Sequence, residues 1–157
     1  MKLSIRESTT LAAPPEAVWT VLEAPRRRGE WNEKIVRVER HRAGPAAVGE
    51  RYTLRYRLGG RERDMEAEVV AYEPPRVLTV REREPREPDP DRAVVLSWRL
   101  EPTASGTRIT QEVDVTHAPM PLAVKLVMWL VARIGKPRGA TVVATLAELV
   151  LTEPPSH

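Results

Sequence analysis

The feature that most constrains the fold is an apolar block near the end of the chain, from Pro121 to Leu151. No other segment is long and apolar enough to form a major helix, because the remaining patterned segments repeat with a period of two. At about 100° per residue its apolar side chains form two stripes, with Lys125 and Arg133 opposite the first, which predicts a helix with one buried face. The first stripe consists of Ala123, Val124, Leu126, Val127, Met128, Leu130, Val131 and Ile134, and the second of Val142, Val143, Leu146, Ala147 and Val150.

The two stripes are out of phase, and a proline lies between them. Projected on a straight helix, they differ by roughly a third of a turn. Pro137 has no amide hydrogen to donate to the carbonyl of Arg133, and its ring clashes with that carbonyl. The block is therefore predicted to be a kinked helix or two successive helices, with the break between Arg133 and Arg138.

Most of the chain before this block alternates apolar and polar residues, which predicts β-strands with one buried face. A glycine pair at residues 59–60 supplies a hairpin turn, across which outward arginines face outward glutamates. An antiparallel sheet with one apolar face needs a cover, so the sheet is predicted to curl around the long helical block in an α+β fold. The predicted strands cover residues 2–11, 34–42, 49–58, 61–72, 76–84, 93–101 and 107–115, and two short helices follow the first strand.

Size and composition narrow the class of protein. A chain of 157 residues has the usual size of one domain, and we expect a single domain over residues 1–157. Cysteine is absent, which excludes disulfides, thiolate catalysis and cysteine metal sites. The first six residues lack the apolar core of a signal peptide, and the longest apolar run, Leu122–Ile134, is shorter than the ~20 residues of a membrane span. We therefore expect a cytoplasmic protein with no membrane span.

The net charge does not point to a nucleic-acid partner. The chain has a formal charge of +3 and a sequence pI of about 9.6. Basic and acidic residues alternate almost everywhere, as in residues 61–64, and this mixing weakens any one-signed field. The compact basic cluster at residues 26–28 has a single aromatic residue nearby, Trp31. We expect no nucleic-acid partner.

The sequence contains no recognisable catalytic or metal-binding constellation. His157 is terminal and His41 lies between two arginines in a predicted turn, so a surface role suits both. His117 lies where the last strand meets the helix, near a predicted cavity mouth, where a role in the junction competes with that of a general base. No spacing supplies a metal site, and no phosphate loop or dinucleotide fingerprint occurs. We therefore assign no catalytic residue, no metal and no cofactor.

Several short motifs recur at matching positions of one superfamily. They cover nearly the whole chain, which resembles the START, polyketide cyclase/dehydrase and pollen-allergen-like (SRPBCC) superfamily. The resemblance implies a helix-grip fold, in which the first and last strands pair and a seven-stranded curved antiparallel sheet grips the C-terminal helix. Its members include lipid carriers, aromatase/cyclases, stress proteins and co-chaperones. The motifs are residues 12–19 (AAPPEAVW), 31–32 (WN), 48–52 (VGERY), 72–78 (YEPPRVL), 98–102 (WRLEP) and 106–108 (GTR).

Two polar residues occupy inward positions of the predicted strands, Glu7 and Gln111. Burying an unpaired carboxylate costs free energy, so Glu7 would destabilise a solid core, whereas in a pocket that contains water its carboxylate could stay solvated. The competing interpretation is that Glu7 lies near a strand end and reaches water. Because the first and last strands are expected to pair, we predict that the two side chains are neighbours inside the concave face, where they could orient a ligand.

These observations favour a hydrophobic or aromatic ligand, lipid-like or polyketide-like, held between the sheet and the C-terminal helix. Enzymatic activity stays open, and the resemblance would then imply a polyketide cyclase or aromatase. The alternative is a protein-interaction module with a packed interior, in which the outer face of the sheet or Trp129 binds a protein partner, and a homodimer also stays open. A connected cavity of a few hundred Å³ would favour ligand binding, and a solid interior would favour the interaction module. The predicted ligand-binding residues are Glu7, Trp31, Tyr52, Tyr56, Met65, Trp98, Gln111, His117, Leu126 and Leu130.

Overall fold

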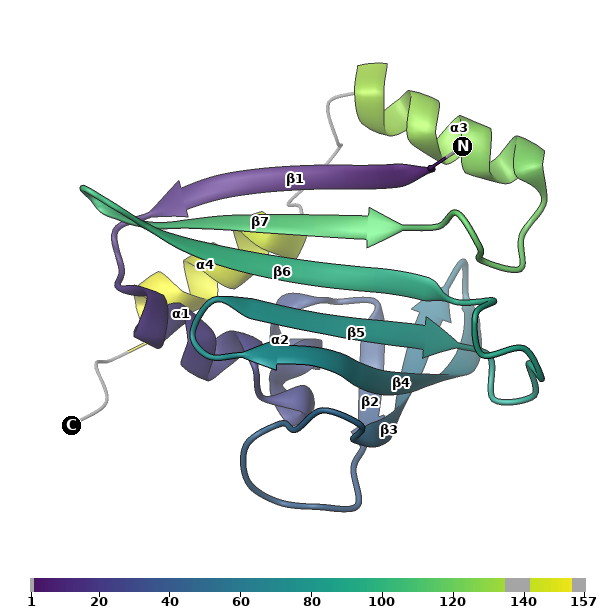
Figure 1. Ribbon diagram of the computed structural model, residues 1–157, viewed down its shortest axis with the longest axis horizontal. Helices are drawn as coiled ribbons and strands as arrows, with labels where there is room; N and C mark the ends of the chain where they lie inside the picture. Colours follow the sequence, from purple (N-terminus) through teal and green to yellow (C-terminus); the bar gives the residue numbers. More distant parts are fainter. Residues whose placement is uncertain (1, 135–141, 154–157) are drawn as a thin grey trace.

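A seven-stranded antiparallel sheet forms the body of the molecule (Figure 1). The structure is a computed structural model and describes residues 2–134 and 142–153. The strand order is β1-β7-β6-β5-β4-β3-β2, so only the first strand pairs out of chain order, with the last. The strands are β1 Ser4–Leu11, β2 Ile35–Glu39, β3 Arg51–Leu58, β4 Arg61–Glu73, β5 Val77–Arg83, β6 Val94–Thr103 and β7 Gly106–Asp114. All seven strands predicted from the alternation are therefore present.

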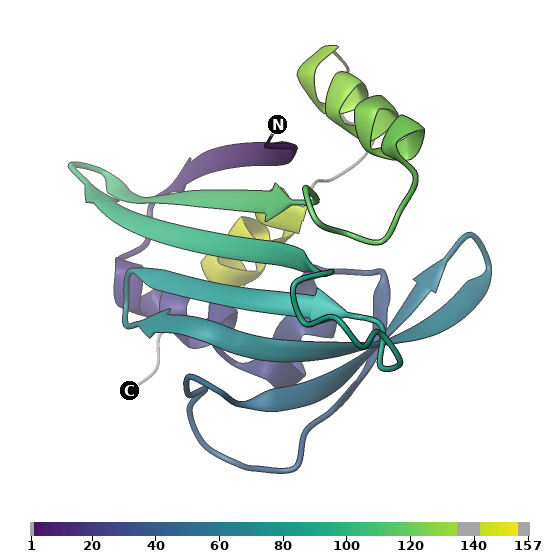
Figure 2. The same ribbon diagram turned by 45° about the vertical axis from the view of Figure 1, so that its right-hand side comes forward.

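Helices cover the concave face of the sheet, as the helix-grip fold requires (Figures 1 and 2). The chain turns through Pro14 and Pro15 into α1, where proline in the first turn removes no needed hydrogen bond. Trp19 of this helix is buried, and its ring centroid lies 5.5 Å from that of Tyr72. The helices are α1 Pro15–Leu22, the 3-10 turn η1 Pro25–Arg27, α2 Arg28–Trp31, α3 Leu122–Ile134 and α4 Val142–Thr152.

Strand register follows the predicted alternation. Glu7 pairs directly with Gln111 across β1 and β7, which confirms that the two side chains are neighbours on one face. Gln111 also pairs with Trp98 on β6, so all three side chains point to the concave side. On the convex side of the β3–β4 hairpin, Arg55 and Arg57 make the expected ion pairs, each at 2.8 Å, with Asp64 and Glu62.

The main core lies between the concave face and helices α1, α2 and α4. The second predicted stripe behaves as expected, since Val143, Leu146 and Val150 of α4 are buried against the sheet. Trp98 is buried among them, and Tyr56 packs against the same core, so the predicted inward registers of β3 and β6 are confirmed. This core determines the position of every side chain in the candidate site.

The first predicted stripe is not buried, and this prediction was wrong. Helix α3 attaches through Lys125, whose ammonium donates to the carbonyl of Thr116 at 2.7 Å. Lys125 is 8% exposed, whereas Leu130 is 47% exposed and Ile134 75%. Periodicity identifies side chains that share a face, but it does not say which face meets the body of the protein. Of the two helices in the C-terminal block, only α4 therefore packs on the concave face of the sheet.

The helical block divides into two helices, which matches one of the two forms predicted. Helix α3 ends at Ile134 and α4 begins at Val142. The expected break at Gly135–Pro137 lies outside the described residues. Within the described part of the chain, no helix is long and apolar enough to cross a membrane.

Candidate functional site

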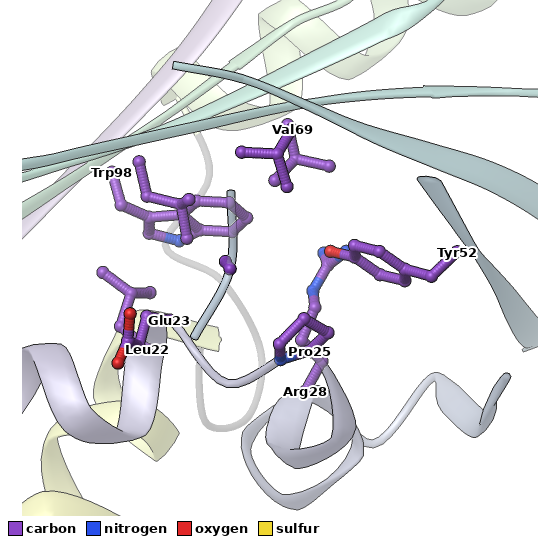
Figure 3. Close-up of a pocket in the computed structure, with 10 residues that line it drawn as sticks. Leu22, Glu23, Pro25, Arg28, Tyr52, Val69 and Trp98 are labelled. Atoms are coloured by element: carbon purple, nitrogen blue, oxygen red, sulfur yellow. The ribbon is translucent and has the colours of Figure 1, made fainter. Parts of the chain in front are cut away.

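An arginine is buried at the centre of the concave face. Arg28 begins α2, and its side chain extends from the helix toward Tyr52, with Trp98 on the other side of the same space (Figure 3). The guanidinium is 3% exposed and pairs with Glu82 of β5, with 2.6 Å between Nη1 and Oε1. Glu82 follows Leu78 and Val80 on the inward side of its strand, so the alternation of side chains along β5 places the Glu82 carboxylate in the core.

Two tyrosines of β3 complete the polar part of the cluster. The hydroxyl of Tyr56 donates to Glu82 Oε2 at 2.7 Å, and Nη1 of Arg28 lies 3.5 Å from the hydroxyl of Tyr52. Burial raises the pKa of both tyrosines, so their hydroxyls stay protonated at neutral pH. Burial opposes the charge of Arg28, but the neighbouring Glu82 outweighs it, and the pKa of Arg28 rises above its ordinary value. The site thus contains one cation, paired with Glu82, and two neutral hydroxyls.

Two tryptophans enclose the guanidinium. Trp31 of α2 and Trp98 of β6 meet edge to face, with ring centroids 5.8 Å apart. The guanidinium carbon of Arg28 lies 5.9 Å from the ring centroid of Trp31 and 5.4 Å from that of Trp98. Cation–π attraction therefore compensates part of the desolvation of the charge.

The cluster has more hydrogen-bond donors than acceptors. Nε and Nη2 of Arg28 and the indole N–H groups of Trp31 and Trp98 are buried, and none of the described residues accepts from them. An unpaired buried donor costs about 1–3 kcal/mol, so four in one cluster are a strong departure from ordinary core packing. An acceptor placed among them would recover this cost.

The space beside these donors is closed. Arg28, Tyr52 and Trp98 line it together with Leu22, Pro25 and other core residues, and it has no volume left for a water molecule. No connected cavity of a few hundred Å³ therefore lies beside these donors. This finding matches the packed interior expected of the alternative, a protein-interaction module.

The predicted site residues fall into three groups. Trp31, Tyr52, Tyr56 and Trp98 come together around Arg28, and Gln111 lies beside Trp98 through strand pairing, with Glu7 next to it. Met65 is half-buried on β4, opposite Leu54. Leu126 and Leu130 are exposed on the outward side of α3, so their predicted place in the interior was wrong. His117 is exposed between β7 and α3, at the junction where it was predicted. A ligand-binding role for the remaining residues stays a prediction.

Sequence reasoning missed the two charged residues at the centre. Arg28 belongs to the basic cluster at residues 26–28, and Glu82 to a run of alternating charges at residues 81–84, and neither pattern predicts a buried charge. A signal was available for Glu82, because it continues the inward register of Leu78 and Val80 in the same way that Glu7 continues that of Leu3 and Ile5. Arg28 shares a helical face with Pro25 and Trp31, both buried, at a spacing of three residues.

The comparison with protein families identifies the chain's relatives. The model of the family described as "Polyketide cyclase / dehydrase and lipid transport" matches residues 2–150. The chain belongs to this family. Its family and fold are those of hydrophobic ligand-binding or polyketide cyclase-like proteins. No curated protein matches the chain significantly.

Solved structures share the fold of this family member at low sequence identity. Protein CV1439 from Chromobacterium violaceum is 20% identical with a TM-score of 0.68, over 96% of this chain and 99% of that one. The Polyketide_cyc-like protein Cgl2372 from Corynebacterium glutamicum is 20% identical, with a TM-score of 0.61 over 97% and 91% of the two chains. Major latex-like protein 151 from Panax ginseng is 13% identical, with a TM-score of 0.63 over 95% and 97%. These similarities establish the helix-grip fold.

Proposed function

We propose that this family member binds a hydrophobic or aromatic small molecule that carries at least one acceptor oxygen. The observation that carries the proposal is the set of unpaired donors on Arg28, Trp31 and Trp98. A ketone, phenolate or carboxylate oxygen among them would accept several hydrogen bonds at once, one of them from a cation. Lipid-like and polyketide-like molecules both combine such oxygens with apolar surface.

The aromatic walls supply the apolar part of the proposed site. Trp31 and Trp98 offer ring faces and edges to a flat ligand, and the hydroxyl of Tyr56 is fixed by Glu82. Because the interior is closed, binding requires side chains to move. Tyr56 and Met65 are half-buried, and methionine adapts readily to new shapes, so this is where we expect the wall to open.

Gln111 and Glu7 extend the polar lining of the proposed site away from Arg28. Gln111 is 7% exposed and pairs with Trp98, while Glu7 is half-buried. A second ligand oxygen could reach the amide of Gln111 while the first lies at Arg28. Gln111→Leu should therefore weaken long, doubly oxygenated ligands more than short ones with a single oxygen.

Matched pairs of molecules test the proposal. Titration of the protein with 2-naphthol and 2-naphthoate, with oleate, and with naphthalene as the hydrocarbon control isolates the contribution of the oxygen. A hydrogen bond involving a charged group contributes about 1.5–3 kcal/mol, so the naphthoate should bind at least ~10-fold more tightly than naphthalene. Native mass spectrometry of protein purified from its own host should also show a co-purifying small molecule.

A second function, a protein-interaction module, is favoured by the closed interior. In that case Trp31 and Trp98 are core packing, and the binding surface lies outside the sheet. Trp129 is half-buried, as predicted for a residue at an interface. Failure of every oxygenated molecule to bind, together with a host preparation free of small molecules, would favour this second function over the first.

A further inference from the structure

Helix α3 presents a broad apolar surface to solvent. Figure 2 shows the helix at the edge of the sheet, beyond the start of β1 and away from α4. Of the twelve large hydrophobic residues that are exposed in the described chain, seven lie on this one helix. They are Leu122, Val124, Leu126, Val127, Leu130, Val131 and Ile134, which are between 39% and 75% exposed.

The opposite side of α3 is attached to the body of the protein. Lys125 donates to the Thr116 carbonyl, and Met128 and Trp129 pack against a small separate core of Leu3, Val115 and Ala118. The guanidinium of Arg133 lies 5.1 Å from the ring centroid of Trp129. The few polar groups of the helix are therefore held on or beside the attached side, and the outward side is left apolar.

The charge of this segment differs from that of the rest of the chain. The sequence contains 22 acidic residues, but none of them lies between Asp114 and Glu148. Basic residues do occur in that interval, and Arg133 is exposed on α3 itself. Elsewhere arginines and glutamates alternate and pair, whereas the charged residues of α3 itself, Lys125 and Arg133, are both basic.

We propose that α3 docks the protein on an anionic lipid bilayer. A 13-residue helix is about 20 Å long and would lie in the plane of the interface, with its outward side among the acyl chains. Trp129 and Arg133 sit at the flank of that side, the place where aromatic and basic residues contact headgroups. Attraction of basic residues to anionic lipids and burial of the seven apolar side chains act together. This proposal does not depend on the interior site.

A second copy of the chain is the other occupant that could cover this surface. In a symmetric dimer the same patch meets itself, so the segment without acids would face its own basic residues with no acid from the segment to balance them. An anionic bilayer provides both the apolar phase and the opposite charge. The charge pattern therefore favours lipid.

The absence of cysteine allows a direct test. Val127→Cys on α3 and Val48→Cys in the loop before β3 each provide one labelling site, and the two valines are similarly exposed, 59% and 64%. An environment-sensitive fluorophore at position 127 should shift to the blue with vesicles of phosphatidylcholine and phosphatidylglycerol. The same label at position 48 should not shift. Val127→Asp should weaken vesicle binding by at least ~10-fold, since it replaces a buried apolar group with a charge in lipid, and Val48→Asp should leave it unchanged.

The possible outcomes separate lipid from a protein partner. Binding that rises with the phosphatidylglycerol fraction and falls with salt supports the proposal. Equal binding to pure phosphatidylcholine, or no binding to either vesicle, overturns it. A blue shift at position 127 without lipid that grows with protein concentration, matched by a dimer in sedimentation, also overturns it in favour of a second copy. Circular dichroism of Val127→Asp shows whether the variant remains folded. If it does not, the blue shift of the labelled Val127→Cys protein still reports lipid binding, because that substitution introduces no charge.

Discussion

Among the described residues, two arginine–glutamate pairs are buried, and they differ in how completely their hydrogen bonds are satisfied. Arg28 and Glu82 are 3% and 5% exposed, and Arg40 and Glu50 are 5% and 2% exposed. Arg40 closes the loop between β2 and β3, whereas Arg28 lies in the core between α2 and the sheet. Equal burial and equal chemistry make the two pairs a natural comparison.

In the loop pair, every side-chain nitrogen of the arginine has an acceptor. Two nitrogens of Arg40 reach Glu50, and its Nη1 and Nη2 also donate to the carbonyls of Gly44 and Pro45 at 2.7 and 3.2 Å. Glu50 accepts in addition from the amide of Ala47 at 3.3 Å. A network of this kind orders a loop and leaves no side-chain nitrogen of Arg40 without an acceptor.

The core pair leaves donors free. Only Nη1 of Arg28 has acceptors, while its Nε and Nη2 face the surrounding aromatic groups. A structural ion pair gains nothing from such surplus donors, since each costs free energy when it is buried without a partner. Burial alone therefore does not distinguish the two pairs, whereas the unpaired donors of Arg28 do.

The largest expected effect comes from breaking the core pair. Glu82→Leu leaves Arg28 charged and unpaired in the core and should lower the free energy of unfolding by about 3–5 kcal/mol. The double variant Arg28→Met/Glu82→Leu should recover most of this loss, because well-packed apolar residues can replace a buried pair. Urea denaturation measures both. A double variant as unstable as the single one would contradict the view that Arg28 contributes little to folding.

The same exchange in the loop pair should not recover stability. Arg40→Met/Glu50→Leu deprives the carbonyls of Gly44 and Pro45 of their donor, and we expect a loss of about 2–3 kcal/mol from these hydrogen bonds. Urea denaturation, with hydrogen exchange of residues 43–50, measures the effect. Full recovery in this double variant would remove the distinction between the two pairs.

Removal of one free donor should affect binding more than stability. Trp98→Phe deletes the unpaired indole N–H and should change the free energy of unfolding by no more than about 1 kcal/mol, while weakening naphthoate binding about 5- to 10-fold. The matched control is Trp19→Phe, because the indole of Trp19 already donates to Glu23 at 3.2 Å. Calorimetric titration compares the variants. An equal loss of naphthoate affinity in the two variants would contradict the role proposed for Trp98.

The smallest effect concerns an ion pair at the surface, which sharpens the contrast with both buried pairs. Hydrogen bonds from Lys2 and Arg6 lower the pKa of Glu112 from its ordinary 4.5 to about 2. The stabilisation is therefore present above pH 4.5 and is lost as the pH falls toward 2. The two cations are exposed and solvent-screened, so we expect at most about 1 kcal/mol. Urea denaturation between pH 5 and 2 measures this pH dependence of the free energy of unfolding, and Glu112→Gln should abolish it.

The sequence by itself determined the sheet and its registers. Alternation specifies which side chains share a face, and a glycine pair or a proline limits where a strand can continue, so seven strands and the inward positions of Glu7 and Gln111 could be predicted. That these two residues are neighbours followed from the resemblance, which implies that the first and last strands pair. The packing of Val143, Leu146 and Val150 followed from their spacing in the same way.

Only the tertiary structure decided which surfaces are covered and which charges meet. Arg28 and Glu82 are 54 residues apart, and each stands in a local run of charges that is typical of a solvated surface. Their pairing depends on where α2 rests on β5, which no local pattern records. The exposure of the apolar side of α3 could not be predicted either, because an apolar stripe has the same periodicity whether the sheet, a lipid surface or another chain covers it.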